Sequence, residues 1–221
     1  MIFDEKVMEM LLEGIRDTLF MVLVSTAAGY ALGLPLGILL AVSGKDGIHP
    51  RPVLYRIFDI ITNILRSVPF LILLILVIPL TRAIIGRSYG PEATIVPLTL
   101  AAAPFIGRMV ESSLKEVDHG VIEAAQSMGT TDGQIIVKVL LGEARISLLI
   151  GVTISMGTVL GYSAMAGVIG GGGLGDIAIR YGYYRYDTQI MIITVVILVA
   201  LVQVLQFIGM RLAARVDKRK K

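Results

Sequence analysis

Glycines at 170, 172 and 175 form a spacing that nucleotide-binding proteins use. The pattern G-x-G-x-x-G holds the pyrophosphate of a dinucleotide where it joins a strand to a helix in a βαβ unit. Here it closes a run of 30 uncharged residues, Ile146 to Gly175. Glycine disfavours helix because it loses the most backbone entropy, so a membrane segment that ends in irregular backbone is indicated. We exclude a dinucleotide site and expect no cofactor.

Other reactive side chains are sparse. The chain has no cysteine, and its two histidines, His49 and His119, lack the spacing of metal ligands. Thiolate chemistry is therefore excluded, and no metal site is expected. The loop G-x4-G-K-[ST], which holds nucleotide phosphates, is absent as well. If ATP drives this protein, hydrolysis takes place on another polypeptide, so we predict that the chain is not an enzyme.

The composition is that of a multi-pass membrane protein. Hydrophobic residues make up 55% and charged residues 17%, with a mean hydropathy of +0.81. A soluble domain carries about 25% charged residues. The first 17 residues are net acidic, which argues against a cleaved signal peptide. Their apolar residues recur at helical spacing and predict a short amphipathic helix that leads into the membrane.

Charge-free runs predict an all-α membrane protein with five transmembrane helices, because about 20 residues cross the hydrocarbon core. We expect them at 18–42, 67–85, 91–110, 146–169 and 188–210. The second is the least clear, since Arg66 and Arg82 enclose only 15 uncharged residues, and 53–66 could extend the same helix. At membrane depth Arg66 would face protein or water and be a functional candidate; otherwise it marks the membrane boundary. Arg108 and Glu111 mark the exit of the third helix.

Small residues recur on two of these helices. Gly29, Gly33 and Gly37 lie four residues apart, and Gly157 and Gly161 repeat the spacing. Such a face lets another helix approach closely. The alternative for the first group is that glycine is simply common in membrane helices.

The basic residues set the expected orientation. The 43–66 connection, the 108–145 interval and the C-terminal tail hold 14 of the 20 Lys and Arg residues. The positive-inside rule makes that side cytoplasmic, with the N-terminus outside and the C-terminus inside. The last bases, Lys218 to Lys221, either contact anionic membrane lipid or serve only as a topological anchor.

The interval 111–145 is the longest stretch outside the predicted membrane helices. Val117, Val121, Ala124, Ala125 and Met128 fall on one side of a helix that Gly129 can end, because glycine adopts positive φ. Thr131 and Gln134 form a capping box for a second helix. The pattern predicts helix, sharp turn, helix. The residues alone leave two alternatives open: an amphipathic helix that seats in a partner's groove, or a solvated hairpin without a partner.

This interval resembles a signature of bacterial ABC importer permeases. Glu123-Ala124-Ala125, Gly129, Val139 and Leu141 match E-A-A-x3-G-x9-I-x-L-P, with valine in place of isoleucine and Gly142 in place of the final proline. The resemblance implies the type I ABC importer permease fold. It also implies that Glu123, Ala124, Ala125, Gln126, Ser127, Met128 and Gly129 form the coupling helix, which docks into a cleft on an ATPase subunit.

Further stretches look like the methionine-importer branch of that family. They are Arg66-Ser67-Val68-Pro69-Phe70, Ala103-Pro104-Phe105, Glu116 to Ala125, and Gly161 to Gly175. The likeness spans nearly the whole chain. It implies a multi-pass permease of the cell inner membrane that carries an amino acid, methionine above others.

The resemblance also implies where the pathway runs, and the residues indicate roles along it. It implies a homodimer with the pathway on the two-fold axis. Tyr162, Ser163 and Met165 would form a translocation gate, since hydroxyls and a soft thioether suit the passage of a thioether amino acid. The alternative for Met165 is that it only packs the helix bundle. Gly170, Gly171, Gly172 and Gly173 would meet a binding protein or line the entrance.

The partners implied are a second copy of the chain, ABC ATPase subunits, an extracytoplasmic substrate-binding protein and membrane lipid, without nucleic acid. Three alternatives remain: a permease for another amino acid or small solute, an ATP-independent channel or secondary transporter, and a scaffold protein without a pathway. Secondary transporters commonly carry ionisable residues within their membrane helices, and the first, fourth and fifth predicted helices have none.

Overall fold

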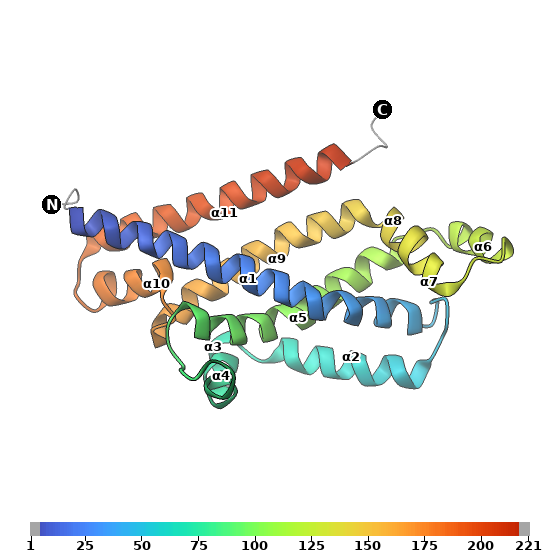
Figure 1. The fold of residues 1–221 in the computed structure, drawn as a ribbon, viewed down its shortest axis with the longest axis horizontal. Helices are drawn as coiled ribbons and strands as arrows, with labels where there is room; N and C mark the ends of the chain where they lie inside the picture. The colour runs from blue at the N-terminus through green and yellow to red at the C-terminus, as the bar shows by residue number, and fades with distance from the viewer. Residues whose placement is uncertain (1–4, 217–221) are drawn as a thin grey trace.

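The computed structural model describes residues 5–216, whose regular elements are all helices joined by short turns, with no strand among them. Four helices are long and apolar enough to cross a membrane: α1 (Glu5–Ser43), α5 (Pro91–Lys115), α9 (Arg145–Ala166, with the 3₁₀ turn that follows) and α11 (Thr188–Val216). They run along the long axis of the bundle in Figure 1. The predicted lipid contact of Lys218–Lys221 lies outside the described residues.

The helix α1 joins the predicted amphipathic entry segment and the first predicted membrane helix without a break. Its glycine face packs on α5, as the spacing predicted. A Cβ atom added to Gly33 would lie 2.7 Å from the carbonyl oxygen of Ala103, and one on Gly37 would lie 2.5 Å from Cβ of Val110. These glycines are therefore needed for close contact between the two helices.

The second predicted membrane helix, over 67–85, is not one helix. The chain instead forms α2 (Pro52–Ser67), α3 (Phe70–Leu76) and α4 (Ile78–Ile85), with a bend of 100° between α2 and α3. Val68 takes an extended conformation because the ring of Pro69 disfavours helix in the residue before it. If α2 and α3 together count as one bent span, the described residues hold five candidate membrane spans. If they do not, the described residues hold four. Residues 53–66 thus belong to a separate helix beside α5.

The interval after α5 has the predicted helix–turn–helix form. It comprises α6 (His119–Ser127), α7 (Asp132–Gln134), the π-helix η1 (Ile135–Leu140) and α8 (Leu141–Glu143). These elements lie at one end of the bundle in Figure 1, and the start of α1 lies with α10 at the other. We call the first the α6 end. The second is the glycine-loop end, after the glycine loop Gly170–Gly173 that leads into α10.

After α9 the chain passes through η2 (Gly167–Ile169), α10 (Gly173–Ile177) and η3 (Ala178–Tyr183) before it reaches α11. Helical structure therefore continues beyond the glycines as far as Tyr183. The main core lies where α1, α5 and α9 meet, around Met21, Leu98, Ile106 and Val159. By contrast, α11 buries only Thr194 and Ala213, so most of its apolar surface is available to lipid or to a second copy.

Candidate functional site

The helix α6 ends just before Gly129, as predicted, but it begins at His119, so Val117 lies before it. The Asp118 side chain accepts a hydrogen bond from the backbone N–H of Gly120 (2.6 Å) and caps the N-terminus. At the other end, Gly129 takes φ of 75°, and the N–H of Thr130 donates to the carbonyl of Ala125 (3.2 Å). Glycine closes this turn because the left-handed region costs it no Cβ clash.

The alanine face predicted for α6 is divided in the structure. Ala125 is 5% exposed and packs against the bundle, whereas Ala124 lies at the surface. The outer side shows Val121, 44% exposed, and Met128, 78% exposed. Because a helix turns about 100° per residue, adjacent alanines cannot share one face. The exposed apolar stripe of α6 is therefore Val121, Ala124 and Met128.

The segment after Gly129 is tied to the rest of the α6 end. The backbone N–H of Thr131 donates to Oε1 of Gln134 (3.3 Å), as expected for the predicted capping box. Nε2 of His49 lies 2.5 Å from Oδ2 of Asp132 and links the turn between α1 and α2 to α7. A cleft of about 680 Å³ opens between α5, α6 and α9, with Glu116 and Ser147 in its lining.

The three predicted gate residues do not share one surface. The Tyr162 ring stacks on Phe70 of α3, with centroids 4.5 Å apart and planes 7° from parallel. Ser163 is 1% exposed, and its hydroxyl donates to the carbonyl of Leu160 (2.8 Å) within α9. Met165 is 51% exposed. Of these three residues, only Met165 is exposed within one chain.

The neighbouring glycine face of α9 is open. A Cβ atom on Gly161 would have nothing within 4 Å, and one on Gly157 would meet only the side-chain amide of Gln206 at 3.5 Å. The close helix contact predicted from this spacing is therefore not made inside the chain at Gly161.

The glycine loop is largely internal. Gly171 and Gly173 are buried, while Gly170 and Gly172 reach the surface in part. The carbonyl of Gly170 accepts from the N–H of Gly90 (2.9 Å), and that of Gly171 accepts from Oγ1 of Thr94 (3.1 Å).

The same loop is joined to α1, where the N–H of Leu174 donates to Oγ1 of Thr18 (2.9 Å). The loop therefore connects α1, α5 and α9 at one end of the bundle. With no strand before it in residues 5–216, it also lacks the βαβ context of a dinucleotide site.

Comparison with known proteins decides the family. A model of the "Binding-protein-dependent transport system inner membrane component" matches residues 33–221. The chain belongs to this family. A "Probable D-methionine transport system permease protein MetI" of Vibrio cholerae is 52% identical over 96% of this chain and 94% of its own length. The "D-methionine transport system permease protein MetI" of Escherichia coli is 49% identical over 74% of this chain and 76% of its own length.

Solved structures agree. A chain of the MetNI methionine ABC transporter, in an inward-facing conformation, superposes with a TM-score of 0.96 at 47% identity, covering 98% of this chain and 100% of its own. A chain of an amino acid ABC transporter, described with histidines, superposes with a TM-score of 0.72 at 20% identity. It covers 97% of this chain and 95% of its own, which shows a shared fold. The permease therefore has the type I ABC importer fold and is a multi-pass inner-membrane component.

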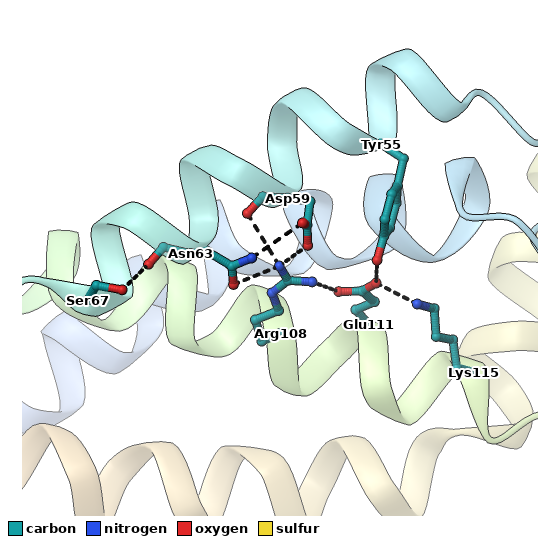
Figure 2. A network of polar contacts seen from close by, with 7 residues as sticks. All are labelled: Tyr55, Asp59, Asn63, Ser67, Arg108, Glu111 and Lys115. Atoms are coloured by element: carbon teal, nitrogen blue, oxygen red, sulfur yellow. Dashed lines mark hydrogen bonds and ion pairs between the residues drawn. The ribbon is translucent and has the colours of Figure 1, made fainter.

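A polar network between α2 and α5 of the permease was not predicted from the sequence. The guanidinium of Arg108 contacts the carboxylate of Asp59, Oδ1 of Asn63 (2.9 Å) and Oε2 of Glu111 (2.6 Å). Glu111 Oε1 also accepts from the Tyr55 hydroxyl (3.1 Å) and from Nζ of Lys115 (2.7 Å). Figure 2 shows these side chains converging between the two helices.

The network holds α2 in place. Glu111 is 5% exposed and Arg108 18%, and the two bases balance the two acids, as buried charges require. Only Thr62 of α2 is itself buried, so apolar packing alone attaches this helix weakly. The sequence spacing could have placed each pair on one helix face, since Asp59 and Asn63 are one helical turn apart, as are Arg108 and Glu111. The pairing across helices has no sequence signature.

Proposed function

We propose that this chain is the permease subunit of an ATP-driven methionine importer. Its relatives named above are methionine permeases, and the near-complete superposition on a chain of the MetNI methionine transporter carries the proposal. Two copies form the pathway between them, ATPase subunits bind at the α6 end, and an extracytoplasmic binding protein delivers the substrate at the other end.

The α6 end lies in the cytoplasm and receives the motion of the ATPase. The stripe of Val121, Ala124 and Met128 seats in a groove of that subunit, because exposed apolar residues at this spacing suit helix-in-groove binding. The remaining residues of 123–129 complete the contact. The N-terminus then lies outside and the C-terminus inside, in line with the distribution of basic residues.

Met165 is the moving part of the gate. Its exposed thioether meets the same residue of the second copy near the two-fold axis, while Gly161, one turn earlier, leaves room for the opposing helix. Tyr162 orients this part of α9 through its stack on Phe70, and Ser163 stays within α9. Replacing Met165 with alanine should lower the methionine taken up per ATP hydrolysed, and unchanged uptake and coupling would remove the gate role.

The glycine loop lies on the extracytoplasmic side. Gly170 and Gly172, the two members that reach the surface, form the entrance or contact the binding protein, and Gly171 and Gly173 fix the loop from within. Lipid covers the apolar outer faces of the helices.

Reconstitution tests this function. The permease is purified with its ATPase, placed in proteoliposomes with the binding protein, and assayed for uptake of radiolabelled methionine with and without ATP. We expect uptake that requires both ATP and the binding protein. Stimulation of ATP hydrolysis by a different amino acid would instead support another substrate. Uptake without ATP would support a channel or secondary transporter, and assembly without uptake a scaffold.

A further inference from the structure

Arg66 carries a charge that the described part of the chain does not neutralise. Its side chain is exposed, near the C-terminal end of α2, and within residues 5–216 it forms no ion pair or side-chain hydrogen bond. Nearby, Asp59 and Glu111 are already matched by Arg108 and Lys115. The polar network is electrically balanced without Arg66, which leaves this guanidinium available to another anion.

The depth of Arg66 follows from the pairing of α2 with α5. Tyr55 contacts Glu111 and Asp59 contacts Arg108, so the two helices run antiparallel. Arg66 follows Asp59 by seven residues, about 10 Å along the axis at 1.5 Å per residue. It therefore lies level with the region seven residues before Arg108, at Ala101. The stack of Phe70 on Tyr162 agrees, since it ties the start of α3 to the part of α9 nearer the glycine-loop end.

That level is close to the middle of the apolar belt. The uncharged stretch of α1 runs from residue 18 to residue 44, with its midpoint at residue 31. Gly29 and Gly33, on either side of the midpoint, contact Ala102 and Ala103 of α5. Arg66, level with Ala101, is thus only about 5 Å from the midpoint at 1.5 Å per residue.

An exposed guanidinium at this depth needs water or protein around it, because hydrocarbon solvates charge poorly. The faces of α2 separate accordingly. Asp59, Asn63 and Arg66 share one side at helical spacing, whereas Ile57 and Ile64 occupy the opposite side, both well exposed. The apolar side suits lipid. The polar side packs on α5 at Asp59 and Asn63, and beyond that contact Arg66 is exposed, which suits a hydrated passage.

We propose that Arg66 lines the translocation pathway and binds the carboxylate of the amino acid in transit. This rests on the proposed function, because the pathway and its amino acid substrate come from it. A guanidinium offers two parallel N–H donors that fit the two oxygens of a carboxylate. Arg66 would then replace the hydration that the α-carboxylate loses on leaving water, midway between the two ends of the bundle.

The first experiment compares Arg66→Gln, Arg66→Lys and Arg56→Gln in the reconstituted importer. Arg56 lies on the same helix near the α6 end and is also exposed. With saturating loaded binding protein, we expect Arg66→Gln to lower methionine uptake per ATP about tenfold, the scale of a lost charged hydrogen bond. Uptake by Arg66→Lys should fall between that of the wild type and that of Arg66→Gln, since lysine cannot bind both carboxylate oxygens in the same way. Stimulation of ATP hydrolysis by the binding protein should stay within about twofold, as docking is untouched.

The outcomes separate the two proposals. If wild-type importer takes up no methionine, the proposed function fails. If wild-type imports and Arg66→Gln imports equally per ATP, the proposed function stands and the role of Arg66 is overturned. A guanidinium held by a lipid phosphate would give this second result. An equal loss of uptake per ATP in Arg56→Gln would also overturn it, because removing any positive charge from α2 would then have the same effect.

A second measurement applies even if Arg66→Gln assembles poorly. The natural chain has no cysteine, so Arg66→Cys and Ile64→Cys each place a single thiol on α2, about 200° apart around its axis. We expect the water-soluble cation 2-aminoethyl methanethiosulfonate to label position 66 and not 64. Attachment of its ammonium group at position 66 should restore part of the uptake. Labelling at 64 alone, or labelling at 66 without any recovery of uptake, would overturn the proposal.

Discussion

Two turns at opposite ends of this permease are built on glycines with positive φ, yet their surroundings differ. At the glycine-loop end, Gly173 has φ of 72°, and an added Cβ atom would lie 2.6 Å from Oγ1 of Thr18. At the α6 end, Gly129 has φ of 75°, and an added Cβ atom would meet nothing within 4 Å. The first glycine is required by packing as well as by backbone conformation, the second by conformation alone.

The difference separates a part that holds the fold from a part that is available to a partner. The glycine loop joins α1, α5 and α9 through hydrogen bonds to Thr18, Gly90 and Thr94. The turn after α6 instead leaves Met128 78% exposed beside it. Substitutions at the first end should therefore change stability, and those at the second should change association.

The largest loss of stability is expected for Gly173→Ala. The methyl group clashes with α1 and the positive φ is strained, so we expect about 3 kcal/mol. Gly170→Ala is the matched control, because its φ is also positive but nothing lies within 4 Å of the added atom. It should cost about 1 kcal/mol. Thermal unfolding of the detergent-solubilised protein measures both, and equal losses would show that close packing is not what distinguishes the loop.

A smaller loss is expected for Asp59→Asn, in the network between the two ends. Removing this charge leaves the half-buried Arg108 with one acid in place of two, which should cost about 2 kcal/mol. Glu92→Gln breaks a pair of similar type with Arg87, but both side chains there are about half exposed. That control should change stability by less than about 0.5 kcal/mol. If thermal unfolding shows equal losses, burial of the network contributes nothing.

Gly129→Ala should lower stability by about 1 kcal/mol, since strain at positive φ is its only cost. Gly129→Asn should cost less, because asparagine tolerates the left-handed region. Hydrogen exchange of the α6 amides is the sensitive measurement. A loss as large as that of Gly173→Ala would contradict the open surroundings of this turn.

Glu123→Arg should change stability least, by less than about 0.5 kcal/mol, because the side chain lies at the surface. Under the proposed function, charge reversal within an interface should still reduce co-purification of the ATPase at least about tenfold. Glu9→Arg, an exposed acid at the glycine-loop end, should leave the ATPase bound. Loss of the ATPase in both variants would show that the α6 end is not the docking end.

The helix–turn–helix after α5 was predicted from the sequence because its signals are local. Gly129 ends one helix, and Thr131 with Gln134 begins the next. The glycine face of α1 was predicted for the same reason, since spacing along one helix defines it. The break at Pro69 was also encoded locally, but it falls inside the uncharged run 67–81. Residues 53–66 were therefore interpreted as part of a connection or as an extension of the second membrane helix.

Other features depended on which helices meet. The sequence marked Arg108 and Glu111 as the end of a membrane helix. The structure pairs them with Asp59 and Tyr55, which lie 49 and 56 residues earlier in the chain. It marked Gly170–Gly173 as a surface loop, and the structure buries Gly171 and Gly173. It grouped Ser163 with Met165, and the structure turns Ser163 inward.

By itself, then, the sequence determined the all-helical membrane class, the positions of most long helices and the turn at Gly129, because hydropathy, caps and glycine conformations act over a few residues. Only the tertiary structure decided which side of each helix is covered. It also decided which charges are neutralised and that Arg66 lies near the middle of the apolar belt without a partner in residues 5–216. Burial and charge pairing depend on residues distant in the chain, and a sequence pattern does not contain those distances.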